Sequence, residues 1–350
     1  MTDVVKKGFR SRALGAGLKA LGASGLPRLA QPFTQGRGAI LMFHHIRPWA
    51  GGVFTPNRGL EITPEFLDET IAALHGRGFD IVPLGEIPAR LRQPNEKPFA
   101  ALTFDDGYRD NLVHAIPVLE KYGAPFTIYI ATGFADGTAR LWWVELENAI
   151  RALDSVPFAG QTLPASAADE KMAAFLAIYW NLRAGSEARL LDEIARIAAL
   201  ARIDGAALTR GLCMNWEEIA KLATHPLCTI GAHTVTHPRL AKLGDAPARQ
   251  EMAASRDAIE ARLGQPVRHF AFPVGDPTSA SPREFAVAAE LGFDTAVTTR
   301  KGMIFDAHAG RLTALPRLSV NGDYQERAYL ELLLTGAPFW LWNRGRRIAA

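Results

Sequence analysis

The chain has 350 residues, 48% of them hydrophobic and 21% charged, which is typical of a globular protein with one large α/β domain or two modest ones. A net charge of +3 gives no reason to expect a nucleic-acid partner, and two cysteines cannot form a disulfide framework. No segment approaches the ~20 consecutive apolar residues of a transmembrane helix.

The N-terminal segment, residues 1–36, interleaves basic and apolar residues. A secretory signal peptide needs an unbroken apolar run after its basic start, and this segment has none. We therefore expect a protein of the cytoplasm or of the cytoplasmic face of the membrane. The spacing fits a basic amphipathic helix that lies on a membrane surface, and equally a solvated helix packed on the domain edge.

Residues 37–322 alternate predicted strands and helices, which indicates a mainly parallel sheet with crossover helices, and six to eight such units favour a barrel. Thr63 is expected to cap a helix that begins at Pro64. The predicted strands are 38–46, 79–82, 99–104, 125–131, 228–232, 267–273, 295–299 and 317–320. The predicted helices are 64–76, 84–91, 111–122, 215–223, 247–263 and 282–291.

Two other segments differ from this alternation. Residues 143–212 are Ala-rich and predicted to be helical without a clear strand, so we interpret them as a helical insertion in the same domain. Residues 323–350 form a C-terminal tail in which aromatic residues at 339–342 precede three arginines. Such a tail suits a membrane interface or an acidic partner, although packing on its own domain is slightly favoured.

Two carboxylates, Asp105 and Asp106, follow directly after the buried strand 99–104. Successive side chains that leave a strand point in different directions, so one carboxylate can face a metal while the other faces a water molecule. Gly107 permits a sharp exit from the strand. The alternative is an Asp pair that caps the following helix.

A second group of polar side chains is His233 and His237, which follow the strand 228–232. Two imidazoles four residues apart can reach one ion, and no Glu follows the first His, which argues against a zinc protease of the His-Glu-x-x-His type. Two imidazoles and one carboxylate are typical ligands of a catalytic zinc with an open water position. The alternative is a pair of surface histidines in a loop.

Together, the motifs TFDDG at 103–107 and HTVTH at 233–237 resemble the polysaccharide deacetylase family, also called the NodB-homology or carbohydrate esterase family 4 enzymes. The resemblance covers roughly 38–320. It implies an α/β fold, a distorted (β/α) barrel of about seven parallel strands, here with a helical insertion. It also implies a metal-dependent hydrolase that removes acetyl groups from an N-acetylated saccharide, and Zn²⁺ or another divalent transition metal as the cofactor.

The same resemblance implies roles for the motif residues. Asp105 would be the catalytic base, and Asp106, His233 and His237 would hold the metal. The bound metal would acidify a water molecule and polarise the acetyl carbonyl while Asp105 takes up the proton. A backbone N–H near Tyr108 would stabilise the oxyanion.

The general acid departs from the common family pattern. Many members carry a late Leu-His motif, but residues 315–320 contain no His. His44, which follows Phe43 at the end of an early strand, matches a motif found in other branches of the family. We therefore assign the acid to His44; the alternative is that His44 and His45 are ordinary strand-end residues.

The third family motif and the aromatic residues give candidates for the substrate groove. Phe272 and Pro273 are expected to wall the groove, and Trp143 could stack on a sugar or pack in the insertion. Tyr108 is also expected there. Arg317 is placed with these substrate contacts, and it is a candidate, with Arg268, to steady the base; both arginines could also be ordinary packing or surface residues.

Two other functions stay open at this point. The same metal site could hydrolyse another small amide or acetyl ester, because the metal is indifferent to the leaving group. The chain could also be a catalytically dead, sugar-binding relative, since the late His is missing. The presence of Asp105 argues against a dead relative, because a binding protein needs no base.

Overall fold

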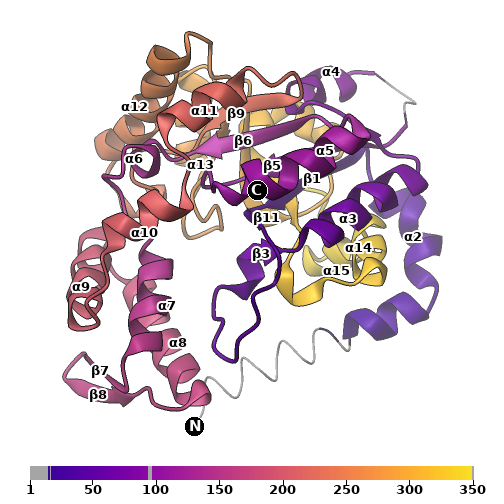
Figure 1. The fold of residues 1–350 in the computed structure, drawn as a ribbon. Helices are drawn as coiled ribbons and strands as arrows, with labels where there is room; N and C mark the ends of the chain where they lie inside the picture. The colour runs from indigo at the N-terminus through magenta and orange to yellow at the C-terminus, as the bar shows by residue number, and fades with distance from the viewer. Residues whose placement is uncertain (1–14, 16, 94–96, 349–350) are drawn as a thin grey trace.

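The computed structural model describes residues 15, 17–93 and 97–348, and it shows an α/β barrel with a helical lobe on one side (Figure 1). Within this part of the chain, seven parallel strands close into a ring, because β1 pairs with both β12 and β5. This confirms the predicted barrel of about seven parallel strands. In ring order the strands are β1 (Gly38–Phe43), β12 (Leu315–Ser319), β11 (Thr295–Lys301), β10 (His269–Ala271), β9 (Cys228–Ala232), β6 (Phe126–Ile130) and β5 (Phe99–Phe104).

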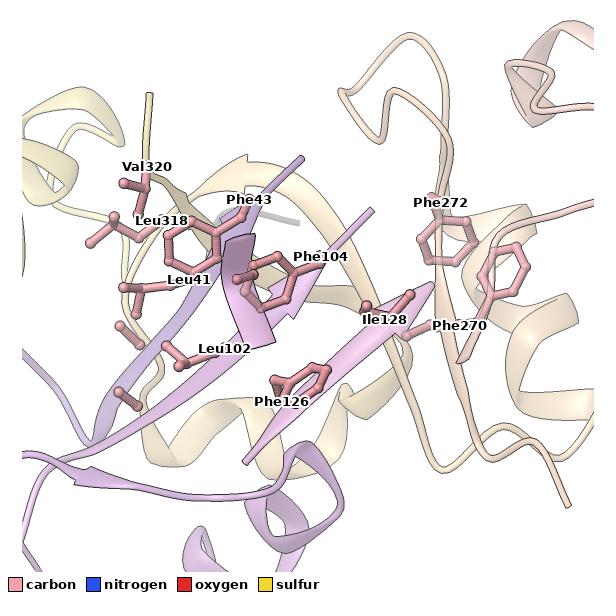
Figure 2. Packing of buried hydrophobic residues seen from close by; sticks show 14 of the residues in the cluster. Leu41, Phe43, Leu102, Phe104, Phe126, Ile128, Phe270, Phe272, Leu318 and Val320 are labelled. Carbon is pink, nitrogen blue, oxygen red and sulfur yellow. The ribbon is translucent and has the colours of Figure 1, made fainter. Parts of the chain in front are cut away.

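The strands lie in the core because their sequences are almost continuously apolar, as expected for parallel strands covered on both faces. Every residue of β1, β5 and β6 is buried. Rings and aliphatic side chains from these strands pack together between the barrel and its helices, with Phe43 stacked on Phe104 (Figure 2). A further short strand, β4 (Asp80–Ile81), pairs with the first residues of β5.

Helices between the strands cover the barrel (Figure 1). Helix α3 begins and ends as predicted, and the Thr63 side chain accepts the amide of Phe66, so the predicted cap is confirmed. The predicted helix 111–122 begins with a π-helical turn, η3 (Asn111–Ala115). The helices of the barrel are α3 (Pro64–Gly76), α4 (Ile87–Arg90), α5 (Ile116–Tyr122), α6 (Thr132–Ala135), α11 (Trp216–Ala223), α12 (Asp245–Leu263) and α13 (Pro282–Glu290).

The insertion forms a lobe with its own hydrophobic cluster. It contains a β-hairpin that the sequence prediction missed, β7 (Ser155–Phe158) and β8 (Gln161–Pro164). Each strand has only four residues, and the turn at Ala159–Gly160, with φ of 50° and 76°, lacks the usual Asn-Gly signal. The helices of the lobe are α7 (Trp142–Ala152), α8 (Ala168–Ala184), α9 (Glu187–Leu200) and α10 (Gly205–Leu212).

Helices from near the two ends of the described chain meet at the side of the barrel. Helix α2 (Leu26–Thr34) packs against α15 (Ala337–Trp342), and α14 (Arg327–Leu334) packs against α3. Much of the predicted N-terminal segment, residues 1–14 and 16, lies outside the described residues. None of the helices in the described residues is long and apolar enough to cross a bilayer.

Candidate active site

The candidate residues lie at the carboxyl ends of neighbouring strands. Asp105 and Asp106 follow β5, His233 follows β9, and His44 lies between β1 and the short strand β2 (His45–Ile46). In parallel α/β barrels this end carries the active site, because the carboxyl ends of all strands open on one face. The fold therefore brings residues almost two hundred positions apart in the sequence to one place.

Asp106, His233 and His237 form a compact buried cluster. Asp106 Oδ1 lies 3.3 Å from the Nε2 atoms of both imidazoles. This oxygen is buried and accepts no hydrogen bond, and the potential ligand atoms all lie within 4.8 Å of one another. A buried carboxylate oxygen without a hydrogen-bond donor is unfavourable, because burial removes its hydration. A divalent cation bound between this oxygen and the two imidazole nitrogens would compensate for that loss.

The two histidines and Asp106 are held in position by the backbone. His233 Nδ1 donates to the carbonyl of Ala271 at 2.7 Å, which leaves the lone pair of Nε2 facing Asp106. Asp106, Thr234 and His237 adopt φ of 68°, 65° and 59°. Non-glycine residues rarely adopt this conformation, and clusters of them are typical of functional sites.

Glu251 on α12 holds the loop 233–237 from outside. Its carboxylate accepts the amides of Val235 and Thr236 at 2.8 and 2.9 Å, and the Thr236 hydroxyl at 2.7 Å. Sequence reasoning missed Glu251, because a side chain that binds only backbone amides and a hydroxyl leaves no motif. Glu251 therefore orients the histidine loop without lying in the metal cluster.

Arg317 binds Asp105 in a bidentate ion pair, with both Nη–Oδ distances at 2.7 Å. It also donates to the Thr298 carbonyl and the Thr103 hydroxyl and is almost completely buried. The substrate contact expected of Arg317 is therefore wrong in this structure, whereas the alternative, that it steadies Asp105, fits the geometry. Arg268 lies at the surface beside Asp294, away from Asp105.

The Arg317 ion pair keeps Asp105 ionised. Burial alone would raise the pKa of Asp105, but the charge and hydrogen bonds of Arg317, aided by the nearby His233, outweigh burial. The pKa of Asp105 is therefore lowered. A carboxylate that is charged and fixed in orientation is available to accept a proton near neutral pH.

His44 and His45 differ in their surroundings. His44 Nε2 lies 3.9 Å from Asp105 Oδ2, and its side chain is partly exposed. Burial lowers the pKa of His44, against the opposing effect of the Asp106 and Asp105 carboxylates. His45 points elsewhere: its Nδ1 pairs with Asp110 at 2.6 Å and its ring stacks on Tyr108. The sequence analysis did not identify Asp110 as a partner of His45, although Asp110 lies just after the TFDDG motif.

Two of the expected groove residues lie in the core. The Phe272 ring is fully buried against Phe270 and Phe285, and Pro273 is buried beside it. Figure 2 shows Phe272 and Phe270 in the hydrophobic cluster. The expectation that Phe272 and Pro273 wall a groove is corrected, because neither side chain reaches a surface. The Tyr108 side chain is also fully buried, and its hydroxyl accepts a hydrogen bond from Trp143 Nε1.

Trp143 lies between the metal cluster and a pocket. Its ring centroid is 4.9 Å from that of His237, and it lines a pocket of about 720 Å³ between α7 and residues 47–61. His45, Trp49, Asn57, Glu147 and Arg151 also line the pocket. The insertion thus forms one wall of this pocket, and Trp143 connects it to the metal cluster through its contact with His237.

Comparisons with known proteins agree with this fold and site. The family model for polysaccharide deacetylases matches residues 92–296, more than half of the 350-residue chain. YxkH of Bacillus subtilis (strain 168), classed among the polysaccharide deacetylases, is 34% identical over 94 residues, which are 26% of this chain and 30% of that protein. The chain thus matches under a third of the length of that relative.

Solved structures share the fold at low identity. A deacetylase of Streptococcus pyogenes, PplD, aligns with a TM-score of 0.54 at 20% identity, covering 82% of this chain and 93% of its own. IcaB from Ammonifex degensii aligns with a TM-score of 0.54 at 18% identity, covering 85% and 98%. From the family match over 92–296, within the barrel described above, we conclude that this chain belongs to the polysaccharide deacetylase family.

Proposed function

We propose that this chain is a metal-dependent hydrolase that removes N-acetyl groups from a GlcNAc-containing saccharide or glycan precursor. The observation that carries the proposal is the convergence of Asp106, His233 and His237 beside the Asp105–Arg317 ion pair. A sugar-binding protein would need no buried base held by a bidentate arginine. This pairing therefore favours an enzyme over a dead relative.

Asp106, His233 and His237 would hold the metal. The donor set of two imidazole nitrogens and one carboxylate oxygen suits Zn²⁺ or another divalent transition metal. Such an ion, when bound, acidifies a water molecule and polarises the carbonyl of the acetyl group. The unsatisfied Asp106 oxygen and the Nδ1–H of His233, donated to a carbonyl, support this assignment.

Asp105 would act as the base and His44 as the acid. Arg317 fixes both oxygens of Asp105, so the carboxylate accepts a proton from the attacking water without having to reorient. His44 Nε2, at 3.9 Å from Asp105, would donate a proton to the leaving amine. Burial lowers the pKa of His44, so its protonated form releases a proton more readily than a free imidazolium does.

The pocket beside Trp143 would hold the saccharide. A pocket of about 720 Å³ is within the size range of ligand sites and larger than one acetyl group needs. Trp49 offers an aromatic ring, the largely buried Trp143 adds apolar lining, and Asn57, Glu147 and Arg151 offer hydrogen-bonding groups, a combination that suits pyranose rings. A small amide or acetyl ester would leave most of this pocket empty.

The test is mass-spectrometric detection of acetyl loss from a panel of N-acetylated saccharides, with acetylated small amides and esters as the competing class. Asp105→Asn should abolish turnover while bound zinc, measured by elemental analysis, stays at the wild-type level. Asp106→Asn should lose the zinc as well. Turnover by Asp105→Asn, or zinc retained by Asp106→Asn, would refute the assigned roles.

The acid needs a separate comparison of adjacent histidines. His44→Asn should lower kcat with little change in KM, because the acid acts on the leaving group and not on binding. If His45→Asn lowers kcat and His44→Asn does not, the acid is His45 with its partner Asp110. Activity on esters, whose leaving alkoxide depends less on an acid, should survive better in His44→Asn than activity on amides.

A further inference from the structure

The apolar side chains of helix α2 point to solvent, whereas those of a helix in a soluble monomer normally point to the interior. Its apolar residues Leu26, Leu29 and Phe33 recur at i, i+3 and i+7 on one face, yet they are between 61% and 76% exposed. Two of its polar residues turn inward: Gln31 accepts a hydrogen bond from Arg77, and Thr34 donates to the carbonyl of Thr335 at 2.7 Å. The apolar face of α2 is therefore open to solvent.

Helix α15 adds a second exposed apolar group beside the first. Trp340, Leu341 and Trp342 at its end are between 44% and 61% exposed, and α15 packs against α2. The close approach depends on Gly336, where a Cβ would meet the Thr34 carbonyl. In Figure 1, α2 in indigo and α15 in yellow accordingly lie together at one side of the barrel. We call the exposed residues of α2 and α15 the terminal apolar face.

The two sequence segments that carry the terminal apolar face contain basic residues but no acidic ones. The sequence has no Asp or Glu from residue 4 to residue 60 or from residue 332 to residue 350. Arg28 is exposed on α2, and three exposed arginines follow α15 at positions 344, 346 and 347. Lys301 lies 4.2 Å from the centroid of the Trp342 ring.

We propose that the terminal apolar face docks on the surface of an anionic lipid bilayer, with its aromatic and aliphatic side chains in the interfacial region. Trp, Phe and Leu next to arginines are the composition of peripheral membrane anchors, in which apolar burial and attraction to anionic headgroups act together. This interaction surface goes beyond the proposed deacetylase activity, and its failure would leave that proposal untouched.

A second copy of the chain fits this face less well. A two-fold symmetric contact through this face would bring together the basic segments of two copies, which contain Arg28 and the arginines at 344–347 and no acidic residue. An anionic headgroup layer supplies the missing negative charge. The combination of exposed apolar and basic side chains on this face therefore favours a lipid surface over a second copy of the chain.

The experiment is sedimentation of the full-length protein with vesicles of phosphatidylcholine alone or mixed with phosphatidylglycerol, at low and physiological salt. We expect binding to the anionic vesicles that weakens with salt and is much weaker to phosphatidylcholine alone. The double variants L29S/F33S and W340S/W342S should each lower the partition coefficient about tenfold or more. R344Q/R346Q should lower it by about fivefold per charge removed.

The matched control is Leu200→Ser, which removes an apolar side chain of similar exposure (49%) from α9, away from this face. It should bind like the wild type. The proposal is overturned if the wild type does not bind anionic vesicles, or if both double variants bind them as well as the wild type. It is also overturned if the protein is a dimer without lipid that L29S/F33S converts to a monomer, because the face is then covered by a second copy.

Discussion

Arg317 should contribute strongly to both the stability and the activity of this protein, and Arg317→Met tests how. The change keeps the volume of the side chain approximately but removes its charge, which leaves Asp105 buried and ionised without a partner. Two unit charges about 4 Å apart attract by ~4 kcal/mol at an effective dielectric constant of about 20. Removing one partner of a buried ion pair costs about 3–5 kcal/mol, so we expect a loss of that size.

The assay is urea unfolding of four proteins: wild type, D105N, R317M and the double variant. If the pair acts as a unit, the double variant should lose less than the sum of the single losses, by about 2 kcal/mol or more. Deacetylation by R317M should fall through kcat, because the base loses its fixed orientation. Arg327→Met, which removes an exposed arginine paired with Glu331, is the control and should change little.

Two results would contradict this prediction: additive losses in the double variant, or an R317M protein that unfolds like the Arg327→Met control. Either result would mean that the bidentate contact contributes no net free energy. A large loss of stability with unchanged kcat would keep the ion pair as a structural element but remove its role in orienting Asp105.

Three further predictions concern residues outside the metal cluster. Glu251→Gln should weaken zinc binding about tenfold, measured with a competing chelator, because the loop 233–237 loses its charged acceptor; unchanged affinity would contradict this. Burial lowers the pKa of His269 to about 4, below the ordinary 6.5, so protonation destabilises the folded state as the pH falls from about 6.5 toward 4. His269→Gln should abolish that acid sensitivity, and a wild type equally stable at both ends of the range would be the opposing result. Thr63→Ala should cost about 1 kcal/mol in urea unfolding through loss of the cap of α3, whereas Thr63→Ser should cost much less.

The sequence determined the barrel strands and the motif residues. Continuous apolar runs such as 99–104 and 228–232 are local signals, and the structure forms β5 and β9 over those ranges. Thr63 and Pro64 likewise predicted the start of α3. The TFDDG and HTVTH motifs named the residues that meet in the cluster, because each motif sits directly at the end of a strand, where the chain leaves the barrel.

The partners of these residues depend on contacts between segments far apart in the sequence. Arg317 meets Asp105 across 212 positions, and Glu251 reaches the histidine loop through backbone amides, so neither pairing leaves a local pattern. Phe272 lies just beyond β10, and whether its ring enters the core depends on how the chain leaves the strand, which the sequence pattern did not show. The exposure of the apolar face of α2 could not be predicted from the sequence either. Periodicity shows that a helix has an apolar side, but long-range packing decides whether that side points to the core or to solvent.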